Sequence, residues 1–282
     1  MTAFLFAGQG SVVPGMREEV ADLRPDLLDA VTEAVGDDPF ARAEESTRYA
    51  QPAILCASLA RWSALGAPAA EALLGHSLGE LSALAAAGSL SERDALSLVA
   101  LRAALMDDAG KPGDGMIAIL RGELPQVQEI ADAHDVTLAN DNAPGQLVLA
   151  GDLERLDAAA EAAKAAGLRA VRLGVSGAFH SPAMASALPA WTQALAAVEF
   201  AAPSATVYSC LTAAPIDDPR QALADGLTSR VRFRESLLAL QTQGVTHFVE
   251  VGPGKVLAGL ASRTLPDATV EIAHVGTIGA HA

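Results

Sequence analysis

The most restrictive feature of this sequence is a Gly-X-Ser-X-Gly pentapeptide, Gly75-His76-Ser77-Leu78-Gly79, which lies between two apolar runs. The short run 72–74 predicts a buried strand, and the Ala- and Leu-rich run 78–87 predicts a helix that stops at Gly88. In this arrangement the serine stands on a sharp turn, and the small glycines on either side let strand and helix approach closely. The pentapeptide therefore indicates an α/β fold with an exposed serine at the end of a strand.

The segment 116–175 predicts a compact unit of its own. Its apolar pattern gives, in order, strand 116–120, helix 125–133, strand 136–139, strand 146–150, helix 153–166 and strand 170–173. This β-α-β-β-α-β order is that of the ferredoxin-like unit. Glycine-rich stretches at both ends are typical of hinges. We therefore expect a ferredoxin-like subdomain at 116–176, inserted into a catalytic subdomain made of 1–115 and 177–282.

Further elements are expected in the larger part of the chain. Apolar runs predict strands at 3–6 and 248–251, and helical spacing predicts a helix over 52–65. Ser91, followed three residues later by Asp94, resembles a helix-start box and predicts a helix over 92–106.

Composition excludes several classes of function. The chain has 282 residues with 34 acidic and 19 basic side chains, a formal net charge of −15. No Lys/Arg cluster could follow a phosphate backbone, so nucleic acid is not expected as a partner. No stretch reaches the roughly 18 apolar residues of a membrane span, and the N-terminus has no signal-peptide pattern. Two cysteines without metal-ligand spacing predict no disulfide framework and no metal site, so we expect a cytoplasmic protein.

Ser77 on its turn is the candidate nucleophile, because the helix that follows supplies partial positive charge and free N–H groups for an oxyanion. A serine nucleophile needs a base, and the chain contains six histidines. His180 is the best candidate, since it lies in a Gly/Ser-rich loop that can aim an imidazole into a cleft. His76 lies inside the turn and is expected to brace it. The remaining histidines are His134, His247, His274 and His281.

Two other residues are candidates for ligand contacts. Gln9 lies between Gly8 and Gly10 directly after the first predicted strand, where ligand sites of open α/β sheets collect; an ordinary glycine turn explains this pattern equally well. Arg102 is flanked by Leu98, Leu101 and Leu105 in an apolar helix. Either it pairs with an anion there, or it reaches solvent at the helix edge.

Seven blocks of sequence together resemble the malonyl-CoA:acyl-carrier-protein transacylases and the acyltransferase domains of polyketide synthases. They are AGQGS at 7–11, QPAI at 51–54, GHSLGE at 75–80, RAALM at 102–106, NDNAPGQLVLAG at 140–151, GAFHSPAM at 177–184 and QGVTHFVEVGPGKVLAGL at 243–260. The blocks span nearly the whole chain in the order of the family. The resemblance implies an α/β-hydrolase-like large subdomain with a ferredoxin-like insert.

The resemblance also implies roles for individual residues. Ser77 would be the acylated nucleophile and His180 its general base. The backbone N–H groups of Gln9 and Leu78 would form the oxyanion hole, and Arg102 would pair with the free malonyl carboxylate.

Three further positions follow from the same resemblance. The backbone carbonyl of Gln243 would orient the histidine, and Asn142 matches an asparagine near the pocket. Phe179 resembles the signature of malonyl-type enzymes, because its ring leaves less room for an α-methyl group on the substrate.

The chain departs from the family pattern at several points. Ala7 and Val12 replace a proline and a glutamine, and the usual SPVRW and SNVT read SRVRF at 229–233 and SCLT at 209–212. The nucleophile, base and arginine positions are intact.

The resemblance implies a cofactor-free, monomeric serine acyltransferase that moves malonyl groups from malonyl-CoA to an acyl carrier protein, in fatty-acid or polyketide synthesis. Alternatives are a malonyl transferase of a malonate decarboxylase system and a hydrolase of carrier-bound acyl groups, which would use the same serine with water as acceptor.

Overall fold

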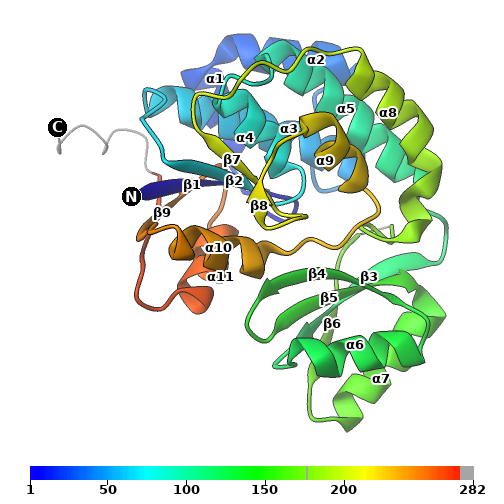
Figure 1. The fold of residues 1–282 in the computed structure, drawn as a ribbon. Coiled ribbons are helices and arrows are strands. Elements are labelled where there is room, and N and C mark those ends of the chain that lie inside the picture. The colour runs from blue at the N-terminus through cyan, green and yellow to red at the C-terminus, as the bar shows by residue number, and fades with distance from the viewer. Residues whose placement is uncertain (176, 274–282) are drawn as a thin grey trace.

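The structure is a computed structural model that describes residues 1–175 and 177–273. It contains a six-stranded sheet and a four-stranded sheet, each with its own helices, so the chain has a large and a small subdomain (Figure 1). None of the described helices is long and apolar enough to cross a bilayer.

The six-stranded sheet of the large subdomain has the order β10-β9-β1-β2-β7-β8. Its strands are β1 (Thr2–Phe6), β2 (Ala72–Gly75), β7 (Thr206–Ser209), β8 (Ala214–Pro215), β9 (His247–Val251) and β10 (Thr269–Ile272). All neighbours pair in parallel except β7 and β8. The central strands β1 and β2 are covered on both faces, which explains their uninterrupted apolar sequences. The strands expected at 3–6, 72–74 and 248–251 are confirmed.

Helices cover both faces of this sheet (Figure 1). One face carries α1 (Met16–Leu23), α2 (Pro25–Val35), α3 (Thr47–Ala64), α4 (Gly79–Ala86), α5 (Glu92–Ala109), the 3₁₀ helix η1 (Pro182–Ala187), α8 (Leu188–Ala196) and α9 (Pro219–Asp225); the other carries α10 (Phe233–Thr242) and α11 (Val256–Thr264). Alternate residues of β1 serve the two layers. Phe4 and Phe6 pack with α3, whereas Ala3 and Leu5 pack with α10 and α11.

Two predicted helix boundaries differ from the structure by more than one residue. The helix expected to begin at Pro52 begins at Thr47, because the Ser46 hydroxyl accepts a hydrogen bond from the backbone N–H of Arg48 and caps the helix earlier. The helix expected to end at Met106 continues to Ala109. Its predicted start is confirmed, since the Ser91 hydroxyl accepts from the N–H of Asp94 at 3.0 Å.

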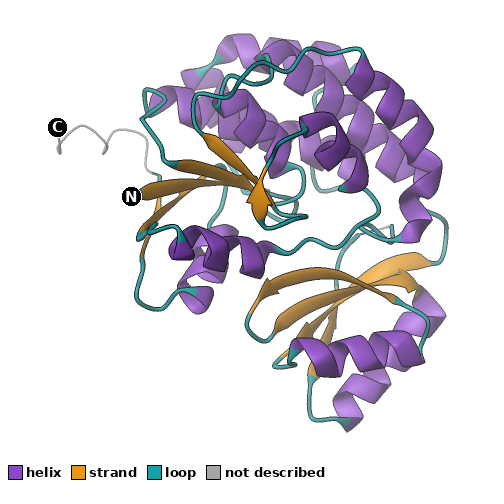
Figure 2. Ribbon diagram, in the orientation of Figure 1, coloured by secondary structure: helices purple, strands orange, loops and turns teal. Residues whose placement is uncertain are grey.

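The small subdomain has the predicted β-α-β-β-α-β order. Its elements are β3 (Asp114–Leu120), α6 (Leu124–Ala133), β4 (Thr137–Ala143), β5 (Gln146–Asp152), α7 (Leu153–Ala165) and β6 (Arg169–Arg172), and the antiparallel sheet has the order β4-β5-β3-β6. Both helices lie on the face that points away from the large subdomain (Figure 2). The insert boundaries at 116 and 176 stay our prediction.

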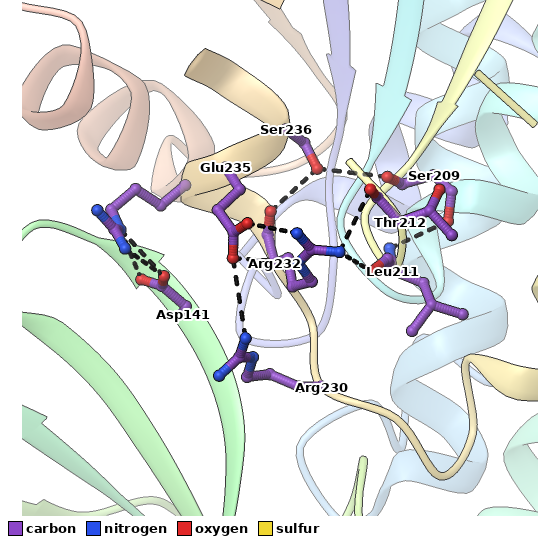
Figure 3. Close-up of polar contacts among 9 residues, drawn as sticks. Asp141, Ser209, Leu211, Thr212, Arg230, Arg232, Glu235 and Ser236 are labelled. Atoms are coloured by element: carbon purple, nitrogen blue, oxygen red, sulfur yellow. Dashed lines mark hydrogen bonds and ion pairs between the residues drawn. The ribbon is translucent and has the colours of Figure 1, made fainter. Parts of the chain in front are cut away.

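Polar contacts tie the small subdomain to the segment before α10. The N–H of Asp141 donates to the carbonyl of Val231 at 2.8 Å, and the Val231 N–H donates to the carbonyl of Ala139 at 2.9 Å. The buried Asp141 carboxylate also accepts from Arg234 at 2.8 Å. Beside it, Arg232 binds Glu235 and the carbonyls of Leu211 and Thr212 (Figure 3). The contacts of Val231 and Arg234 fix the edge strand β4 against the large subdomain.

Candidate active site

Ser77 lies on the sharp turn between β2 and α4. Its backbone has a φ of 55°, in the left-handed region. A Cβ on Gly75 would lie 1.9 Å from the carbonyl carbon of Gly79, and a Cβ on Gly79 would lie 2.3 Å from the backbone oxygen of Phe6. Only glycine fits at both positions, so the predicted strand–serine–helix turn is present.

The Ser77 hydroxyl is hydrogen-bonded to His180, 103 residues further along the chain. The Ser77 Oγ to His180 Nε2 distance is 2.8 Å, and His180 Nδ1 lies 2.8 Å from the carbonyl oxygen of Gly226. A carbonyl only accepts, so Nδ1 carries the proton and Nε2 is free to accept one from the serine. The structure thus brings the two predicted residues into the geometry of a nucleophile and its base.

The predicted contact between His180 and Gln243 is wrong. Gln243 is the exposed C-cap residue of α10, and the carbonyl that orients the imidazole belongs to Gly226, directly after α9. The contact uses only the backbone, which every residue has. No side-chain pattern could therefore have marked Gly226 in the sequence.

Burial sets the protonation state of His180. The side chain is almost fully enclosed, and desolvation, aided by the positive charge of Arg102, lowers its pKa to about 3. The imidazole is therefore neutral near pH 7, the state in which Nε2 can take a proton.

Arg102 reaches the serine from α5. Its Nη2 donates to Ser77 Oγ at 3.1 Å, and its Nη1 donates to the side-chain oxygen of Gln51 on α3. Only 5% of the residue is exposed, and burial lowers its pKa to about 10. Both partners are neutral, and no ion pair of Arg102 occurs among residues 1–175 and 177–273. Of the two alternatives for Arg102, the arginine that reaches solvent at the helix edge is wrong. A buried guanidinium with free N–H groups is suited to an anionic ligand.

His76 braces the turn, as expected. Its Nε2 lies 2.8 Å from the side-chain oxygen of Asn142 on β4, and its ring packs against Phe233 with centroids 5.1 Å apart. Burial lowers the pKa of His76. Asn142 therefore acts on the turn through His76 and connects the small subdomain to the nucleophile.

A cavity of ≈ 740 Å³ between the subdomains opens onto Ser77. The predicted site residues that line it are Gln9, Ser77, Leu78, Arg102, Asn142, Phe179 and His180. The Gln9 side chain is fixed by the Thr47 hydroxyl, which donates to its Oε1 at 2.8 Å. The oxyanion-hole role of the Gln9 and Leu78 N–H groups stays a prediction. The volume is typical of a small-molecule site.

The cavity chemistry rests on polar side chains and backbone groups. In the part of the chain that the structure describes, no three His, Cys, Asp or Glu residues lie together as a potential metal site. Cys56 and Cys210 are buried free thiols. His274 and His281 lie outside the described residues.

Comparison with known proteins places these features in one family. Residues 3–279 match the family described as the acyl transferase domain. The malonyl CoA-acyl carrier protein transacylase of Bacillus subtilis is 38% identical over 289 residues, which cover 93% of this chain and 89% of that protein. The polyketide biosynthesis protein ThaF of Burkholderia thailandensis is 38% identical over 284 residues, 94% of this chain and 24% of that protein. The crystal structure of an acyl-carrier-protein S-malonyltransferase from Burkholderia pseudomallei matches with a TM-score of 0.90 and 36% identity, covering 96% of this chain and 95% of that one.

Proposed function

This chain belongs to the acyl transferase family, and we propose that it moves a malonyl group from malonyl-CoA to the phosphopantetheine thiol of an acyl carrier protein. The observation that carries the choice of acyl group is the buried cation of Arg102, whose Nη2 lies 3.1 Å from the Ser77 hydroxyl. A malonyl group presents a thioester carbonyl to the serine and a free carboxylate to this guanidinium.

The proposed reaction has two halves that use the same groups. In the first, Ser77 Oγ attacks the thioester carbonyl while its proton passes to His180 Nε2, and that proton then leaves with the CoA thiol. The Gly226 carbonyl stabilises the protonated imidazole through Nδ1–H. In the second, His180 takes the proton of the carrier thiol, whose sulfur attacks malonyl-Ser77, and Ser77 regains a proton from His180. The Gln9 and Leu78 N–H groups would hold the oxyanion in both halves.

Phe179 is proposed to restrict the acyl group further. It lines the cavity and only 5% of it is exposed, so its ring occupies space beside the reacting centre. A branched acyl group with an α-methyl substituent would need that space.

We also propose a monomer that acts in the cytoplasm without a metal or redox cofactor. All groups of the reaction come from one chain, and the proton transfers need only side chains and backbone. Two free thiols fit a reducing compartment.

The direct test is the intact mass of the protein after mixing with malonyl-CoA or acetyl-CoA. A malonyl adduct, with acetyl-CoA giving little or none, supports the proposal. A malonyl transferase of a malonate decarboxylase system would give the same adduct. It is distinguished because its malonyl group passes only to the carrier protein of that system. Equal labelling by both donors would contradict the role of Arg102.

His180→Ala should slow self-acylation by roughly 100- to 10,000-fold, because a general base typically accelerates a reaction by this factor. His134→Ala, at the C-cap of α6 and remote from the cavity, is the matched control and should react normally. The rate of malonyl adduct formation measures both. Near wild-type rates in the His180→Ala variant would show that another group acts as the base.

The acylation rate should keep its value from pH 8 down to about pH 5. An ordinary histidine base loses half its activity near pH 6.5, whereas the pKa of His180 is lowered to about 3. The same depression makes the fold less stable as the pH falls from 6.5 toward 3, because in that range the unfolded chain binds a proton at His180 that the folded protein does not. A pH profile of kcat/KM reports the free enzyme; a half-point near pH 6.5 would show that His180 is not desolvated.

A further inference from the structure

Glu80 is a buried carboxyl group that the proposed reaction does not use. It is the second residue of α4, and only 3% of it is exposed. Its Oε1 accepts a hydrogen bond from the backbone N–H of Cys210 at 2.6 Å, and Cys210 Sγ in turn accepts from the N–H of Ser77 at 3.4 Å. Glu80 is therefore connected through Cys210 to the back of the nucleophile turn.

Glu80 and Arg102 line the same small cavity behind the serine, together with Ser77 and His180. Its free volume is ≈ 10 Å³, which holds about one water molecule. Bulk solvent therefore does not screen the two charges from each other.

Arg102 is a buried cation whose hydrogen-bond partners are neutral, and Glu80 supplies a carboxyl group to the cavity that the two residues share. Burial raises the pKa of Glu80 above its ordinary value, and the Cys210 N–H and the positive charge of Arg102 oppose this rise without reversing it. A position in the first turn of α4 also favours negative charge. Arg230 lines the same cavity, but its guanidinium lies 3.9 Å from Glu235, a carboxylate that it shares with Arg232 (Figure 3). Glu80 in turn opposes the lowering of the Arg102 pKa by burial.

We propose that Glu80 is the internal counter-charge of Arg102 and thereby sets how strongly the site prefers a carboxylated acyl group over an uncharged one. In the free enzyme it compensates a buried cation that otherwise has neutral partners. When a donor carboxylate binds, two anions share one guanidinium. Glu80 therefore weakens the interaction between Arg102 and the malonyl carboxylate and favours later release of the malonyl group to the acceptor. This inference rests on the proposed malonyl transfer.

Glu80→Gln isolates the charge, because glutamine keeps an oxygen that accepts from the Cys210 N–H. The variant should raise the ratio of kcat/KM for malonyl-CoA over acetyl-CoA about tenfold, the order of magnitude expected for removing one buried unit charge at an effective dielectric constant of about 20. Glu250→Gln is the matched control. Glu250 is also buried, but it caps α11 by accepting from the N–H groups of Leu257 and Ala258. Its variant should leave the ratio unchanged.

The double variant E80Q/R102A separates a charge role from a structural one. With Arg102 removed, Glu80→Gln should no longer change the donor ratio. In thermal or urea unfolding, R102A should also restore stability lost in E80Q, since it removes the uncompensated cation; a merely structural Glu80 predicts additive losses. An unchanged ratio in E80Q, or additive losses in the double variant, would overturn the inference.

The outcomes separate this inference from the proposed function. A wild-type enzyme that takes no malonyl group contradicts malonyl transfer itself. A wild-type enzyme that is labelled normally, with E80Q showing the wild-type donor ratio, contradicts only the role of Glu80. The unfolding comparison does not depend on any substrate.

Discussion

Ser77→Ala is expected to abolish the malonyl adduct. The Ser77 hydroxyl is the group held by both His180 Nε2 at 2.8 Å and Arg102 Nη2 at 3.1 Å, so its loss removes the acceptor of the acyl group. Intact-mass measurement after mixing with malonyl-CoA gives the occupancy directly. Single-turnover transfer to the carrier protein should disappear with the adduct.

Ser82→Ala is the matched control for this experiment. Ser82 lies on α4 just after the turn, is fully buried, and its hydroxyl has no hydrogen-bond partner within the described residues. Its removal should leave adduct formation intact. A stoichiometric adduct in Ser77→Ala would assign the nucleophile to another residue.

Arg102→Ala should reverse the donor preference. Removing one partner of a desolvated charge pair costs on the order of 3 to 5 kcal/mol, which corresponds to a fall of roughly 100- to 4,000-fold in malonyl acylation. An acetyl group has no carboxylate, so its rate should be little affected or should rise. Initial self-acylation rates with both donors on the same folded variant measure the change.

The comparison between donors is internal, because a general loss of stability lowers both rates. Arg93→Ala, an exposed arginine in the first turn of the same helix, should leave the ratio unchanged. An equal fall of both rates in Arg102→Ala would show that Arg102 has only a structural role. The preference for malonyl-CoA would then depend on other residues.

The elements of the fold that could be predicted from sequence are those whose apolar spacing is local. The small subdomain was predictable because each strand has one face against α6 or α7 and the other toward the large subdomain, which gives a clear alternation. The start of α3 was not, because the apolar spacing that predicted this helix begins at Pro52, whereas the Ser46 cap lies six residues earlier.

The residues of the candidate site could be predicted where the functional group is a side chain within a distinctive local sequence pattern. Ser77 and His180 both lie in turns where the backbone is left-handed. Such turns are recognisable in the sequence by their glycines. The contact of the Gly226 carbonyl with His180 has no such sequence pattern. The contact of Gln51 with Arg102 and the shared cavity of Glu80 and Arg102 depend on how α3, α4 and α5 pack, which residue spacing does not encode.

The central claim is that the acyl group waits on the enzyme for a carrier thiol, and the lifetime of the malonyl-enzyme tests it most directly. The isolated malonyl-enzyme is followed by intact mass in carrier-free buffer and after addition of an acyl carrier protein bearing its phosphopantetheine arm. We predict an adduct that persists over many turnover times without the carrier and is discharged within one turnover when the carrier is added, with the malonyl group appearing on the carrier. Decay to free malonate at the same rate with and without the carrier would contradict the account and identify a hydrolase.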